Sequence, residues 1–85
     1  MGKDQAARFH GNIDELKIKL SQYIKSENRE YDELTLNYLD KWIWIYTYDE
    51  DYGIYLDINF SKDFSEDEIK LFINGLKLLG FDIEY

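Results

Sequence analysis

The chain has no cysteine and no apolar run longer than Trp42–Tyr46. Without cysteine it can form neither a disulfide framework nor a thiolate site. This is typical of the reducing cytosol, so we expect a cytoplasmic protein. The apolar run is far short of the ~20 residues that a membrane-spanning helix requires. The first residues, MGKDQAARFHGN, contain no apolar stretch, so we expect no secretory signal.

Groups suited to catalysis are also scarce. His10 is the only histidine, and no Ser-His-Asp set can be assembled around it. The glycines are scattered and form no phosphate-binding loop. The segment Asp49–Gly53 resembles the start of a calcium loop, but its sixth position is Ile54 instead of glycine and its twelfth is Phe60 instead of glutamate. We therefore expect no enzymatic activity, no cofactor and no metal site.

Negative charge is abundant. The formal net charge is −8, and residues 30–60 alone hold eight acids against one base, Lys41. Such a balance opposes binding to nucleic acid or to anionic lipid. It favours a basic protein as the partner.

The N-terminal part of the chain predicts a loose arm over residues 1–11, followed by a single domain over residues 12–85. A helix is expected at 12–28, with Asn12 as its N-cap and Glu15 as the capping-box acid. The apolar residues of this segment recur at helical spacing: Ile13, Leu16, Leu20, Tyr23 and Ile24.

Residues 34–60 alternate with period two, which predicts three antiparallel strands in a meander. The breaks between them fall at Asp40-Lys41 and at Asp49–Gly53. The first strand has an alternative, because Glu33–Leu39 could instead extend a helix from Tyr31.

The two predicted hairpins support each other. A two-residue turn at Asp40-Lys41 pairs Ile45 with Leu36, and a four-residue loop at Asp49–Tyr52 pairs Ile45 with Leu56. Both registers place the same apolar set on one face of the sheet: Leu34, Leu36, Tyr38, Ile43, Ile45, Ile54, Leu56 and Ile58.

A second helix is predicted from Ser65, which caps it together with Glu68, to Gly80, where a left-handed residue ends a helix without strain. Its apolar stripe is Ile69, Phe72, Ile73, Leu76 and Leu79. Phe81, Ile83 and Tyr85 then alternate with acids as a short closing strand. The predicted order is α-β-β-β-α-β, a two-layer α+β sandwich.

If both helices cover the Ile45 side of the sheet, the opposite side carries aromatic rings among polar groups. These residues are Trp42, Trp44, Tyr46, Tyr48 and Tyr55, with Glu33, Asp57, Asn59, Asp82 and Glu84. Exposed patches of this kind usually have a binding role, and Tyr and Trp are frequent interface anchors. In the alternative, one helix packs on each face, or a second protomer covers the rings.

The coarse pattern resembles small acidic inhibitors that phages deploy against host nucleases, including some anti-CRISPR proteins. The resemblance rests on the helix Asn12–Asn28, a meander broken by DEDYG and a terminal helix begun by SEDE. It covers most of the chain as topology and charge. It implies a non-enzymatic DNA mimic that occupies a basic, nucleic-acid-binding surface of a partner protein. The basic first helix departs from the pattern and has to face away from such a partner.

The residues expected to contact the partner are Glu33, Trp42, Trp44, Tyr46, Tyr48, Asp49, Glu50, Asp51, Tyr52, Tyr55 and Asp57. Two other functions fit the same residues. One is an immunity protein or antitoxin that neutralises a toxic nuclease. The other is a structural module that homodimerises through the aromatic face.

Overall fold

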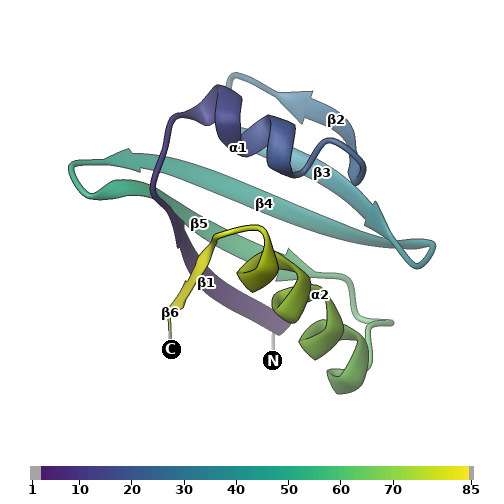
Figure 1. Cartoon of the computed structure of the whole chain (residues 1–85). Coiled ribbons are helices and arrows are strands. Elements are labelled where there is room, and N and C mark those ends of the chain that lie inside the picture. The colour runs from purple at the N-terminus through teal and green to yellow at the C-terminus, as the bar shows by residue number, and fades with distance from the viewer. Residues whose placement is uncertain (1–2, 85) are drawn as a thin grey trace.

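The computed structural model describes residues 3–84 and shows an α+β fold of two helices and a six-stranded antiparallel sheet (Figure 1). The elements are β1 (Lys3–Phe9), α1 (Ile13–Lys19), β2 (Ile24–Asn28), β3 (Glu33–Tyr38), β4 (Lys41–Glu50), β5 (Gly53–Phe60), α2 (Glu66–Leu78) and β6 (Asp82–Glu84). In the sheet the strands follow the order β2-β3-β4-β5-β1-β6. The predicted order α-β-β-β-α-β is wrong on the N-terminal side, where β1 precedes the first helix and β2 follows it.

The first strand corrects the prediction of a loose arm over residues 1–11. Lys3–Phe9 lie between β5 and β6, with Ala7 opposite both Leu56 and Ile83. Ala7 and Phe9 are buried, whereas Arg8 between them faces the other side. Alanine has a low strand propensity, and the partners of this strand lie far along the chain, so local periodicity did not reveal it. Residues 1 and 2 lie outside the described part.

The first helix is shorter than the predicted 12–28. Its N-cap is as expected, because the backbone N–H of Glu15 donates to Asn12 Oδ1 at 2.8 Å. The helix ends at Lys19, and the chain turns through Leu20 into β2. In that turn the N–H of Tyr23 donates to the carbonyl of Leu20 at 2.9 Å. A turn and a continued helix both bring apolar residues three or four apart to the same side, so the spacing did not separate them.

Strands β3, β4 and β5 are antiparallel neighbours in chain order, but they form part of a six-stranded sheet, with β2 beside β3 and β1 beside β5, and not a three-stranded meander. The turn between β3 and β4 is Leu39-Asp40, both with positive φ (55° and 61°), as a type I′ hairpin turn requires. Consequently Ile45 lies opposite Leu34 and Ile58, two residues away from each predicted pairing. Because side chains alternate with period two, a shift of two leaves every residue on its predicted face.

The second helix matches its prediction. Ser65 Oγ accepts from the Glu68 N–H, and the Glu68 carboxylate accepts from the Ser65 N–H at 2.8 Å, which completes a capping box. Gly80 follows the helix with φ +98°. Lys41 of β4 donates to the same Glu68 carboxylate at 2.6 Å, so this end of α2 is tied to the sheet.

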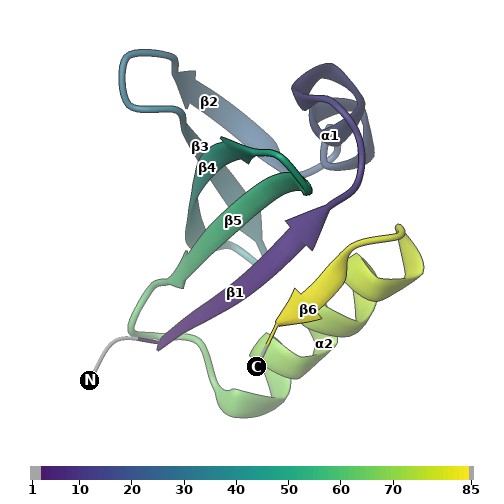
Figure 2. The same ribbon diagram turned by 90° about the vertical axis from the view of Figure 1, so that its left-hand side faces the viewer.

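Both helices lie on the same face of the sheet (Figure 2). Leu16 and Leu20 from α1 and Phe72, Ile73 and Leu76 from α2 join one buried cluster with the inward residues of the strands. These inward residues include Leu34, Leu36, Ile43, Ile45, Ile54, Leu56 and Ile58, as predicted. No helix of residues 3–84 covers the opposite face, which we call the open face.

Candidate protein-binding face

The aromatic residues of the open face come mainly from β4. Trp44 lies between Thr35 of β3 and Asn59 of β5, and Tyr48 lies opposite Tyr55. The two tyrosine rings are 6.0 Å apart between centroids. Trp42 is 44% exposed and Tyr48 is 51% exposed, whereas Trp44, Tyr46 and Tyr55 are half-buried. The strand alternation that buries Ile43 and Ile45 therefore turns all of these rings outward.

Carboxylates surround the rings. The registers of β1, β3, β4, β5 and β6 place six acids on the open face, and the described residues of these five strands place one base there. The acids are Asp4, Glu33, Glu50, Asp57, Asp82 and Glu84, and the base is Arg8. The open face is therefore strongly acidic as well as aromatic.

Arg8, on β1, links three strands of the open face. Its guanidinium binds Glu50 of β4 at 3.0 Å and Glu84 of β6 at 2.9 Å, and lies 5.9 Å from the centroid of the Tyr55 ring. Hydrogen bonds to Glu84 and Glu50 raise the pKa of Arg8 above its ordinary value. Two of the six carboxylates on the open face thus share the one positive charge of Arg8.

Tyr46 lies between two further carboxylates, with Glu33 across from it on β3 and Asp57 on β5. A hydrogen bond to Glu33, partial burial and the nearby charge of Asp57 raise the pKa of Tyr46. Within the described residues, Glu33 and Asp57 take part in no ion pair. The centre of the open face therefore presents a phenol held between two uncompensated negative charges.

The DEDYG segment is organised differently from its prediction. Asp49 and Glu50 end β4 on opposite faces, and Asp51-Tyr52 alone form the tip, followed by Gly53 with φ +116°. Glu50 lies on the open face with the other predicted site residues Glu33, Trp42, Trp44, Tyr46, Tyr48, Tyr55 and Asp57. Asp51 and the 81%-exposed Tyr52 lie at the end of the sheet, and Asp49 faces the helix side.

Sequence reasoning missed Asp4 and Arg8, because it missed β1. The available signal was the short alternation in residues 6–9, in which Ala6 and Arg8 face one way and Ala7 and Phe9 the other. His10, beyond the strand, reaches Asp82 Oδ2 with Nε2 at 2.5 Å.

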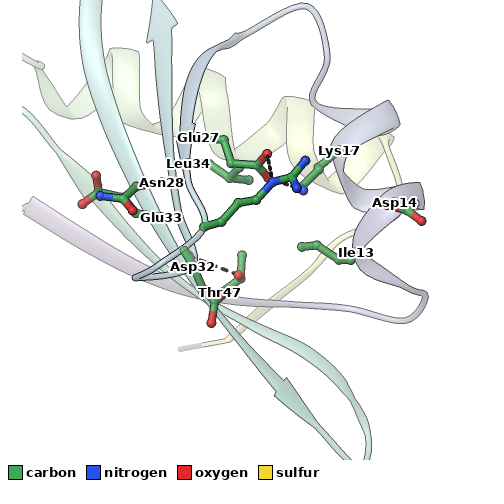
Figure 3. Close-up of a pocket in the computed structure, with 10 residues that line it drawn as sticks. Ile13, Asp14, Lys17, Glu27, Asn28, Asp32, Glu33, Leu34 and Thr47 are labelled. Atoms are coloured by element: carbon green, nitrogen blue, oxygen red, sulfur yellow. Dashed lines mark hydrogen bonds and ion pairs between the residues drawn. The ribbon is translucent and has the colours of Figure 1, made fainter.

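A hollow of about 380 Å³ lies on the helix side, between α1 and strands β2 and β3 (Figure 3). Lys17 and Glu27 face one another across it, and Arg29 Nε is 3.3 Å from the same Glu27 carboxylate. The hydrogen bond from Lys17, with a further one from Arg29, lowers the pKa of Glu27. Lys17 and Arg29 thus both form ion pairs with Glu27 inside the hollow. This leaves the hollow less suited to a charged ligand than the open face.

Within residues 3–84 no three His, Cys, Asp or Glu side chains are placed so that they could hold one metal ion, and no helix there is long and apolar enough to cross a membrane. Comparisons with protein-family models, curated proteins and solved structures found no match to this chain. The functional interpretation therefore rests on the chemistry of the open face.

Proposed function

We propose that this chain is a non-enzymatic inhibitor that binds a basic, nucleic-acid-binding surface of a partner protein through its open face. The observation that carries this proposal is the composition of the face, where outward aromatic rings lie among six carboxylates and a single arginine. Carboxylates form charge-assisted hydrogen bonds with the lysines and arginines that otherwise hold phosphates. Tyr and Trp rings provide the desolvated contacts that dominate interface energies.

The charge of the open face also separates this function from homodimerisation through the same surface. Two copies docked face to face would bring together two sets of carboxylates, and among the described residues of β1 and β3–β6 Arg8 alone provides an opposite charge on that face. Like charges placed opposite one another across an interface are strongly unfavourable. A basic partner meets no such repulsion, and its attraction to the acidic open face raises the rate of association.

The class of partner is the finer part of the proposal. A phage-type inhibitor acting on a host nuclease, as in anti-CRISPR proteins, fits the acidic open face and its aromatic anchors. The basic residues Lys17 and Lys19 lie on α1, which covers the opposite side of the sheet, and Lys25 lies on the edge strand β2. An antitoxin acting on a toxic nuclease uses the same contacts, so identifying the partner decides between the two.

The test uses affinity purification from the natural host with the wild-type chain, followed by competition with a DNA duplex for each captured protein. The open-face variant Glu33→Gln/Asp57→Asn removes the two uncompensated central charges. The variant Asp40→Asn/Asp67→Asn, with the same change of charge at exposed positions outside the face, is the matched control.

We expect one basic nucleic-acid-binding protein to be retained by the wild type and the control, and lost with the open-face variant. DNA should displace it. A partner that binds the open-face variant equally well, or that DNA does not displace, contradicts the proposal.

A further inference from the structure

The open face contains a hollow of about 350 Å³ above Ala6 of β1. It is lined by Asp4, Gln5, Ala6, Tyr55, Asp57 and Glu84. Register explains the space, because Ala6 lies opposite Asp57 of β5 on one side and Glu84 of β6 on the other. The alanine side chain is too short to fill the gap between these two longer neighbours.

The next outward position on β1 shows what kind of group suits this environment. Arg8 follows Ala6 on the same face, and its guanidinium lies against Tyr55 and binds Glu84. A guanidinium thus already occupies one position of this row between an aromatic ring and carboxylates. At Ala6, two residues before Arg8 on the same strand, the neighbours again include the ring of Tyr55 and carboxylates, here those of Asp57 and Glu84. The alanine, however, provides no guanidinium to bind them.

Charge in the hollow is not balanced from within. Asp4, Asp57 and Glu84 line it, and no base does so within residues 3–84. Glu84 is held by Arg8, whereas Asp4 and Asp57 take part in no ion pair of the described residues. Its volume is at the low end of the ~300–1,000 Å³ typical of ligand sites, which suits one long side chain.

We infer that this hollow receives an arginine side chain of the partner protein. The methylene stem would lie over Ala6, and the guanidinium would bind Asp57 and stack on Tyr55, much as Arg8, two residues further along the strand, binds Glu84 and lies over Tyr55. Arginine suits the site better than lysine, because its planar fork binds carboxylates in pairs and stacks on aromatic rings. The inference rests on the proposed function, since it names the contact that the open face makes with its basic partner.

The direct test is an NMR titration of the full chain with Nα-acetyl-arginine methylamide, compared with the uncharged isostere Nα-acetyl-citrulline methylamide. We expect saturable shifts of the amides of Ala6, Asp57 and Glu84 with the arginine probe alone. Asp57→Asn should weaken its binding about two- to fivefold, the range that ~0.4–1 kcal/mol for an exposed ion pair gives. Asp40→Asn, the charge-matched control in the turn between β3 and β4, should leave it unchanged.

A second variant tests the shape of the hollow without changing charge. Ala6→Val adds methyl groups at a strand position that favours β-branched residues, so the sheet should be kept while the hollow is filled. It should abolish the saturable shifts, whereas Thr35→Val, at a half-buried open-face position on β3, should preserve them. Each of three results would overturn the inference. The citrulline probe binds as well as the arginine probe, the Ala6→Val variant binds the arginine probe as the wild type does, or the arginine probe shifts only the amides of other acidic residues.

The two proposals can fail separately. If Glu33→Gln/Asp57→Asn loses the partner but Ala6→Val binds it normally, the proposed function stands and the arginine site is wrong. If the arginine probe binds as expected but no partner depends on the open face, the site stands and the inhibitor function is wrong.

Discussion

Trp44 and Ile45 are neighbours on β4 with opposite surroundings, and truncating each to alanine tests the one-sided sheet. Ile45 is fully buried, and Ile→Ala changes at such sites destabilise by about 2–5 kcal/mol. Trp44 is half-buried on the open face and has two lateral neighbours, Thr35 and Asn59. At roughly 0.2–1 kcal/mol per cross-strand pair, Trp44→Ala should lose about 0.4–2 kcal/mol. The larger side chain is therefore expected to contribute less to stability.

The assay is urea unfolding of both variants, followed by far-ultraviolet circular dichroism at two protein concentrations. We expect both midpoints to fall, that of Ile45→Ala by more, with slopes close to that of the wild type. The midpoint should not depend on protein concentration, since that dependence marks an oligomer. If Trp44→Ala loses as much stability as Ile45→Ala, the ring belongs to a covered core. If Trp44→Ala lowers the midpoint only at the higher protein concentration, a second copy of the chain covers the Trp44 ring, and the homodimer is correct.

Three further predictions concern the hairpin tip, a turn and a helix end. Asp49→Lys/Asp51→Lys should keep the fold, since both side chains are exposed. In calorimetry it should weaken partner binding and reduce the salt dependence of that binding. Unchanged affinity and an unchanged response to salt would exclude the tip as a contact. Gly53→Ala should lower the free energy of unfolding by ~1–3 kcal/mol in urea titrations, because φ is +116° and the added Cβ would lie 2.6 Å from the Phe9 carbonyl oxygen; an unchanged midpoint would refute this. The pKa of Glu68 is lowered from 4.5 to about 2, first by its hydrogen bond with Lys41, so its contribution to stability is present above pH 4.5 and is lost as the pH falls through 2. Acid titration of Glu68→Gln should show a smaller loss of stability over that interval than the wild type, and identical curves would contradict the assignment.

The elements that sequence predicted well are those specified by neighbouring residues. The capping box of Ser65 and Glu68 and the glycine at 80 define α2 within its own segment. The alternation around Ile45 likewise fixed which side chains point inward, although each turn is centred one residue from its predicted position, which shifts each pairing by two residues. Turn position depends on which residues adopt positive φ, and Leu39 at φ +55° is not a residue that the sequence rules favour there.

The elements that sequence missed are specified by distant partners. Lys3 pairs with Phe60, and Ala6 with Glu84, so β1 is stabilised by segments that lie near the other end of the chain. Its own residues have little preference for a strand, with two alanines at its centre. A single-sequence rule that considers windows of ~11–18 residues has no access to such pairing.

The missed strand also changes which carboxylates are free to bind. Without β1, the acids at the hairpin tip would be the natural contact, because they are the densest run of charge. With β1 in place, Arg8 pairs with both Glu50 of β4 and Glu84 of β6, so these two carboxylates share one positive charge within the chain. The uncompensated charge lies instead at Glu33 and Asp57, on either side of Tyr46 and beside the hollow above β1. A partner that recognises charge on the open face should therefore dock over the centre of the sheet.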